Sequence, residues 1–131
     1  MSVETQIAET WLRSTLGQII AINPGPRVYA HQAPQNAVYP LIIFSPLSAT
    51  DINALKARGT TRILMQVKAV SEGQTMPQAL ADSIDELLQD VGATQDGVRL
   101  RWKRVQTLEY TETRNGKRYN HLGGIYRCFA G

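Results

Sequence analysis

The sequence contains a single cysteine, and this scarcity excludes several classes of protein. Cys128 has no second cysteine with which to form an intramolecular disulfide, so the fold must depend on packing and hydrogen bonds. It also belongs to no Cys-x-x-Cys or cysteine-histidine spacing of the kind that holds zinc. This use of cysteine fits a reducing cytoplasm, and we expect Cys128 to be a buried, unreactive thiol.

Long apolar runs are absent as well. No stretch approaches the roughly 20 apolar residues that span a bilayer, and the segment MSVETQIAET carries acidic residues where a signal peptide carries positive charge. We therefore expect no membrane partner and no export by that route. With 131 residues, 43% of them hydrophobic and 19% charged, the chain suits a single domain, residues 1–131, with one core.

Catalytic motifs are also missing. His31 and His121 lie far apart and outside any His-Glu-x-x-His pattern. Gly25, Gly116 and the pair Gly123-Gly124 match neither the dinucleotide-binding nor the P-loop spacing. We expect no catalytic residue, no metal and no cofactor, and an enzyme acting on a small molecule is the least favoured function.

What the sequence does have is an uneven distribution of charge. Residues 1–97 contain six basic and nine acidic residues, whereas residues 98–131 contain eight basic and two acidic ones. A mainly acidic body therefore carries a basic C-terminal part. This division indicates an anionic partner, either nucleic acid or the acidic surface of another protein copy.

Two amphipathic helices are predicted. Apolar residues recur at helical spacing from Val3 to Ala21, and the sequence Asn-Pro-Gly-Pro at 23–26 ends this helix. A second helix begins near Pro77 and is expected to end at Gly92. A short third helical segment, capped by Thr50 and ended by Gly59, is expected between two strands.

The remaining segments predict strands at residues 28–30, 39–45, 61–71, 98–110 and 118–129. Asn115-Gly116 predicts a two-residue hairpin turn between the last two strands. Gly123-Gly124 predicts a bulge or a close approach of two backbones. The order of elements indicates an α+β fold, an antiparallel or mixed β-sheet with two helices packed on one face.

The second predicted helix carries an acidic row that needs an explanation. A solvated helix face is the simplest one, but the row reaches the C-terminal end of a helix without basic residues, where the helix dipole disfavours negative charge. We hypothesise that this row contacts the basic row of a neighbouring copy, head to tail, against the alternative of two unrelated solvated faces. The acidic row is Asp82, Asp85, Glu86 and Asp90, and the basic row is Arg99, Arg101 and Lys103.

The basic row also raises the alternative of a small nucleic-acid-binding domain, with Trp102 and Tyr110 stacking bases. In an alternating strand, however, aromatic residues point to the core and charges point to water. No helix-turn-helix, RNP or zinc-finger motif accompanies the row.

Across nearly its full length the chain resembles the tail-terminator or tail-completion proteins of long-tailed bacteriophages, related in role to the lambda tail terminator. The features that carry the resemblance are the N-terminal amphipathic helix, the strand with Tyr39-Pro40-Leu41-Ile42-Ile43, the passage from the strand Ile63–Val70 through Ser71-Glu72-Gly73 into the helix Ala79–Leu88, and the closing hairpin ending in Tyr126-Arg127.

The resemblance implies a virion structural protein with an α+β fold, assembled in the host cytoplasm and placed at the head-tail junction. It implies a self-assembled ring, a hexamer, that caps the tail tube, ends its polymerisation and joins the tail-tube protein to a head-completion or neck protein, with DNA passing through the lumen without specific binding. Another neck or tail-tube subunit is the alternative within this class. The expected tube or neck contacts are Asp51, Lys56 and Arg58 in the segment 48–59, and Arg114, Asn115 and Lys117 at the hairpin tip.

Overall fold

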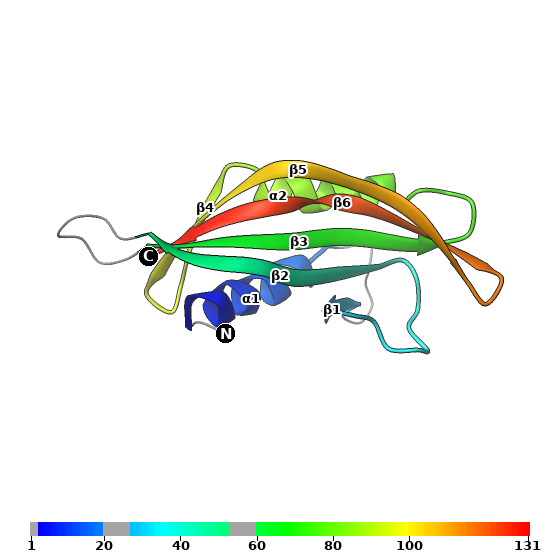
Figure 1. Cartoon of the computed structure of the whole chain (residues 1–131), viewed down its shortest axis with the longest axis horizontal. Coiled ribbons are helices and arrows are strands. Elements are labelled where there is room, and N and C mark those ends of the chain that lie inside the picture. Colours follow the sequence, from blue (N-terminus) through cyan, green and yellow to red (C-terminus); the bar gives the residue numbers. More distant parts are fainter. Residues whose placement is uncertain (1–2, 20–26, 53–59) are drawn as a thin grey trace.

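A computed structural model describes residues 3–19, 27–52 and 60–131 of the chain (Figure 1). Within these residues there are two helices and six strands, and the strands form one sheet in the order β1-β2-β3-β6-β5-β4. Their bounds are α1 Val3–Leu16, β1 Val28–Ala30, β2 Leu41–Ile52, β3 Thr60–Glu72, α2 Gln78–Leu88, β4 Val91–Gln95, β5 Val98–Arg114 and β6 Lys117–Ala130.

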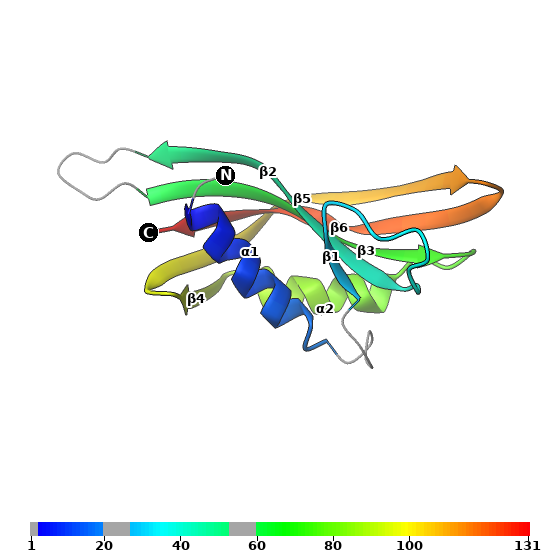
Figure 2. The ribbon, with the colours of Figure 1, turned by 90° about the horizontal axis from the view of Figure 1, so that it is seen from below.

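The sheet is mixed. β1 pairs with β2 in parallel, whereas the pairs β2–β3, β3–β6, β5–β6 and β4–β5 are antiparallel. The chain is thus an α+β protein, as the order of elements predicted. β5 and β6 are the longest neighbours, and their hairpin reaches past the helices at one end of the molecule (Figures 1 and 2).

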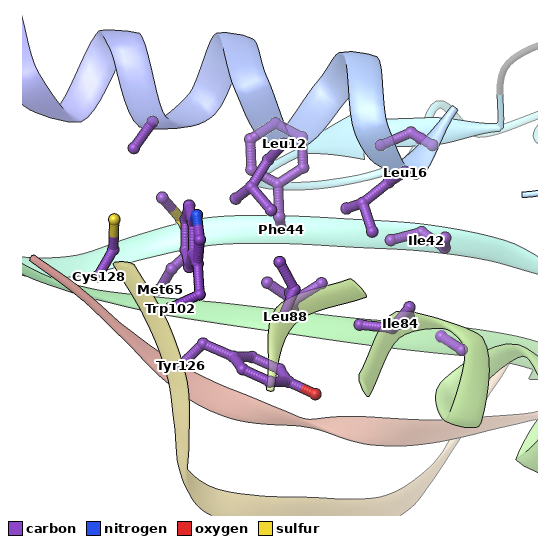
Figure 3. Packing of buried hydrophobic residues seen from close by; sticks show 14 of the residues in the cluster. Leu12, Leu16, Ile42, Phe44, Met65, Ile84, Leu88, Trp102, Tyr126 and Cys128 are labelled. Carbon is purple, nitrogen blue, oxygen red and sulfur yellow. The ribbon is translucent and has the colours of Figure 1, made fainter. Parts of the chain in front are cut away.

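Helix α1 packs through a stripe of buried residues. Thr5, Ala8, Leu12 and Leu16 are buried, and their spacing of three or four residues places them on one side of the helix. Figure 3 shows Leu12 and Leu16 pointing toward the sheet, where Phe44 of β2 lies. The predicted helix is confirmed, but it ends at Leu16 instead of Ala21.

Helix α2 packs in the same way. Its buried residues are Leu80, Ala81, Ile84 and Leu88, and they join the α1 residues in one hydrophobic cluster with the sheet. The sheet contributes alternate residues, because successive side chains of a strand point to opposite faces. Trp102 of β5 and Tyr126 of β6 are the largest of its buried side chains, and Trp11 of α1 stacks on Trp102 with ring centroids 5.5 Å apart.

Gly123 and Gly124 of β6 confirm the predicted close approach of backbones. A Cβ atom at Gly123 would lie 2.2 Å from the carbonyl oxygen of Val67, and one at Gly124 would lie 2.8 Å from that of Gln106. Opposite Ile125 and Tyr126, next to Gly124, the register of β5 shifts between Arg104 and Gln106. The bulge is therefore in β5. Gly123 and Gly124 have no Cβ atom and so leave room for the backbones of β3 and β5.

Two further predictions about the elements were wrong. The second helix ends at Leu88 and not at Gly92, because Asp90 adopts a left-handed conformation (φ 56°) and the chain then enters β4, a strand that was not predicted. Residues 48–52, where a helical segment was expected from Thr50, extend β2 and pair with β3. The rest of that segment, with Lys56 and Arg58, lies outside the described residues.

Candidate functional site: a basic sheet face

The register of the sheet places five basic side chains on one face. In β5, Leu100 and Trp102 are buried, so Arg99, Arg101 and Lys103 point to the opposite face, as the alternating pattern predicted. Arg62 of β3 and Arg127 of β6 alternate with the buried residues of their own strands, so their side chains lie on the same face as those of Arg101 and Lys103. We call this set the basic face, which consists of Arg62, Arg99, Arg101, Lys103 and Arg127.

The cross-strand pairs of the basic face bring like charges together. Lys103 lies directly opposite Arg127, while Arg101 and Arg62 flank Phe129 from its two sides. The guanidinium carbon of Arg127 lies 4.7 Å from the centre of the Phe129 ring, and that of Arg101 lies 5.9 Å from it. Like charges that face each other across a strand pair destabilise a sheet, so this arrangement has a cost in the isolated subunit.

The basic face makes no ion pair within the described part of the subunit. The buried Nε of Arg127 has no hydrogen-bond partner. An anionic surface placed against this face would therefore supply partners that the subunit itself does not provide.

The members of the acidic row differ in their exposure and in their contacts. Asp82 and Glu86 are exposed and one helical turn apart, as a surface row requires. Asp85 is partly buried, and its Oδ1 lies 3.0 Å from Arg104 Nη1 and accepts the hydroxyl of Tyr126 at 2.9 Å. The charge of this helix is therefore partly neutralised within one subunit.

Asp90 was predicted to belong to this acidic row, and that prediction was wrong. It follows the end of α2 and lines a groove of about 320 Å³ together with Arg101, Lys103 and Phe129. Asp90 consequently borders the basic face. Asp82 and Glu86 lie beyond the other face of the sheet, because α2 packs on the side to which Tyr126 points.

The hairpin tip has the predicted geometry. Asn115 (φ 52°) and Gly116 (φ 76°) both have positive φ, as the common two-residue turn requires. Arg114 Nε lies 3.6 Å from Glu112 Oε1, and Lys117 Nζ lies 3.9 Å from Glu72 Oε1. Both basic side chains are more than half exposed, so these ion pairs leave them available to a partner.

Asp51 lies near the end of β2, away from the hairpin tip. Its Oδ1 accepts a hydrogen bond from Thr61 Oγ1 at 3.2 Å. It is exposed, as a contact residue must be. Figure 1 shows the end of β2 and the β5–β6 hairpin at opposite ends of the long axis of the molecule.

The expectation that Cys128 is a buried thiol is confirmed. Burial raises the pKa of Cys128 to about 12, so its thiol stays protonated at neutral pH. Within the same residues, no group of three or more His, Cys, Asp or Glu side chains is placed to hold a metal ion. None of the described helices has both the length and the apolar character needed to cross a membrane.

Arg62 and Arg127 were not identified from the sequence. Each lies in a strand that was predicted correctly, and Arg127 alternates with buried Tyr126 and Cys128. What was missing was the order of the strands, because only the pairing of β6 between β3 and β5 brings the two arginines beside Arg101 and Lys103.

Comparison with known proteins gives the chain a family. Residues 11–123 match the family described as tail completion protein gp17. No curated protein matches the sequence. The matched residues extend from within α1 into β6 and include α2, the β5 part of the basic face and the hairpin tip. The chain therefore belongs to the tail completion protein gp17 family and is a structural protein of the phage tail that interacts with other tail components.

Proposed function

We propose that this protein is the subunit that completes the tail by forming a closed ring, a hexamer, on the end of the tail tube. The ring ends polymerisation of the tube and joins the tail to the head or neck, without catalytic activity. The observation that supports this proposal best is the basic face, whose like charges face each other and make no ion pair in the described part of the subunit.

A head-to-tail contact would provide that partner. We take both helices to cover one face of the sheet, because α1 and α2 enter a single buried cluster with alternate residues of β3 and β6. Asp82 and Glu86 then lie on the side of the subunit opposite to the basic face. Two different, complementary surfaces on opposite sides of one rigid domain are what a heterologous contact needs, and such a contact closes into a ring when its rotation permits.

The two ends of the molecule provide further contacts in this proposal. The hairpin tip, with Arg114, Asn115 and Lys117, lies at one end, and Asp51 lies near the end of β2 at the other (Figure 1). One end would contact the tail-tube protein and the other the head-completion or neck protein. Lys56 and Arg58 follow Asp51 in the sequence and would extend its surface.

Binding of nucleic acid is the second candidate function. The arginines that surround Phe129 would suit phosphate groups as well as carboxylates. The acidic groove residue Asp90 argues against continuous contact with a phosphate backbone. In the proposed ring, DNA passes through the lumen without being bound specifically.

Two charge-reversed variants test the ring contact. One carries Arg101→Glu with Lys103→Glu, and the other carries Asp82→Lys with Glu86→Lys. Each variant alone opposes like charges in a head-to-tail contact, so each should remain monomeric when its mass is measured by light scattering, with or without purified tail tubes. An equimolar mixture should assemble again, because alternating subunits restore opposite charges in a ring with an even number of copies.

Glu109→Lys is the matched control, because Glu109 is exposed on β5 but outside both surfaces. It should assemble as the unmodified protein does. Assembly of either double variant alone, or failure of the mixture to recover, would reject the proposed contact. If only the first variant also loses binding to DNA, and that binding is salt-dependent, the nucleic-acid function is favoured instead.

A further inference from the structure

A second polar site lies away from the basic face, where the β5–β6 hairpin begins to leave the body of the molecule. It is a pocket of about 440 Å³ between the hairpin, β3 and the segment that follows β1. We call it the hairpin pocket. The lining residues that matter here are His31, Lys68, Tyr110, Glu112, Arg114 and His121.

The hairpin pocket carries an excess of one positive charge. Lys68 Nζ donates a hydrogen bond to the Tyr110 hydroxyl at 2.5 Å, and none of the ion pairs among the described residues involves Lys68. Arg114 Nε lies 3.6 Å from Glu112 Oε1. Glu112 is the one carboxylate among the lining residues, so Lys68 keeps an uncompensated charge.

His121 adds an unsatisfied polar atom. Its Nε2 lies 2.8 Å from Glu112 Oε1, and because a carboxylate can only accept, Nε2 carries the proton. The side chain is 5% exposed, and its ring stacks on Tyr110 with centroids 4.2 Å apart. Nδ1 is buried and has no hydrogen-bond partner. A polar atom in this condition costs free energy unless a partner reaches it.

We propose that the hairpin pocket binds one carboxylate group of a partner protein, either an aspartate or glutamate side chain or a chain end. Lys68 and Arg114 supply the positive charge, and the Tyr110 hydroxyl, which accepts from Lys68, can donate its own proton to the carboxylate. This site is distinct from the ring contact and does not depend on it.

The charge of the pocket favours a carboxylate over a phosphate. With Lys68 and Arg114 positive, Glu112 negative and His121 neutral, the free pocket has a net charge of plus one. A phosphate with a second negative charge would have to lie near the carboxylate of Glu112. Such a contact between like charges is unfavourable.

Binding should be coupled to protonation of His121. Burial lowers the pKa of this residue, the hydrogen bond to Glu112 opposes that effect, and the nearby charges of Lys68 and Arg114 add to it. The other titratable groups around the pocket are Tyr110 on β5, Tyr119 on β6, and His31 and Tyr39 on the segment after β1. A bound carboxylate brings a negative charge that favours the imidazolium, and Nδ1 then gains a proton to donate.

The test uses the full-length protein with isotopically labelled histidine and N-acetylglutamate amide as the probe. The His121 signals, distinguished from those of His31 by a His31→Asn variant, should shift saturably, and the pKa of His121 should rise by about 1 or more. N-acetylglutaminamide, the neutral analogue, should have no such effect. Lys68→Met should weaken binding of the probe about tenfold or more, whereas Lys103→Met, the same change on the basic face, should not alter it.

Arg114→Gln provides a second variant if Lys68→Met fails to fold, because Arg114 is 57% exposed at the surface. Equal shifts with the acid and its amide, or no saturable shift, would overturn the proposal. Tighter binding of inorganic phosphate than of the probe would overturn the assignment of the ligand as a carboxylate. Light scattering on the same Lys68→Met sample should still show the assembly state of the unmodified protein, so a failure here is distinguishable from a failure of the ring contact.

Discussion

Asp85 of α2 joins Arg104 of β5 to Tyr126 of β6 through one carboxylate oxygen, which lies 3.0 Å from the guanidinium and 2.9 Å from the phenol hydroxyl. Burial and the hydrogen bond to Asp85 raise the pKa of Tyr126 well above its ordinary value, so the phenol remains a donor. This contact fixes the helix on the sheet and places an acceptor beside an otherwise buried hydroxyl. It also neutralises one acidic residue near the helix C-terminus, where the dipole disfavours negative charge.

Removal of this carboxylate should destabilise the subunit. Asp85→Ala leaves the hydroxyl of Tyr126 without an acceptor, which should lower the free energy of unfolding by about 1–3 kcal/mol, as measured by urea denaturation. Arg104→Gln should lower the free energy of unfolding by less, because the side chains of Arg104 and Asp85 are 40% and 30% exposed. Glu86→Ala removes an exposed carboxylate of the same helix and serves as the control. Equal urea midpoints for the Asp85 and Glu86 variants would show that the Tyr126 contact contributes little.

The same contact shows where the sequence was informative and where it was not. Apolar spacing predicted α2, and the acidic residues opposite that stripe were evident. The partner of Asp85 could not be identified, because Arg104 lies 19 positions away and reaches the helix only through the order of the strands. Arg104 alternates in phase with buried Leu100 and Trp102 and so points to the helix side, but the sequence does not show that α2 covers this part of β5.

Strand β4 was missed for a related reason. Val91 continues the apolar spacing of Leu87 and Leu88, so periodicity alone extends the helix. The positive φ of Asp90 ends it in the structure, and Asp96-Gly97 turns β4 back onto β5. By contrast, β3 and the Asn115-Gly116 turn were predicted well, because alternation over many residues and a turn dipeptide are both local signals.

The close approach at Gly123 should make this position intolerant of any side chain. In Gly123→Ala, the new methyl group would lie 2.2 Å from a carbonyl oxygen and 2.5 Å from the Cα of Lys68, so β3 and β6 would have to separate. We expect a loss of about 3 kcal/mol or more, or failure to fold, in thermal and urea unfolding. Gly92→Ala is the control, because its new methyl group would lie 3.9 Å from the carbonyl oxygen of Leu100, an ordinary contact distance. Similar stability of the two variants would contradict this description of the strand contact.

The thiol of Cys128 should be unreactive in the folded protein. It is fully buried, and its pKa of about 12 leaves almost no thiolate at pH 8. Iodoacetamide should therefore modify it only at the rate of unfolding, and rapidly in denaturant, as followed by mass spectrometry. Fast modification without denaturant would indicate that β6 opens at its C-terminal end.

The length of the β5–β6 hairpin should matter for joining the tail, and not for folding. Deletion of the pair Arg114 and Lys117 shortens both strands by one residue and keeps the Asn115-Gly116 dipeptide. We expect an unchanged urea midpoint, because both side chains are more than half exposed, and a loss of tails joined to heads in electron micrographs. Arg114→Gln removes the charge but keeps the length of the hairpin, so it separates the effect of charge from the effect of length. Normal joining by the shortened protein would exclude the hairpin tip as a contact.

Protonation of His121 should make the free protein less stable in mild acid. Burial lowers the pKa of this residue below its ordinary value of 6.5, so in the window between its folded and unfolded pKa values the unfolded chain binds more protons than the folded one. The contribution of His121 is fully present above about pH 6.5 and is lost as the pH falls toward its folded pKa. Urea unfolding between pH 7.5 and 5 should therefore show a falling free energy, and His121→Phe, which can still stack on Tyr110, should reduce that slope. His31→Asn, which changes an exposed histidine, is the matched control for loss of an imidazole. If His121→Phe and the unmodified protein show the same slope, another group controls the acid sensitivity of the fold.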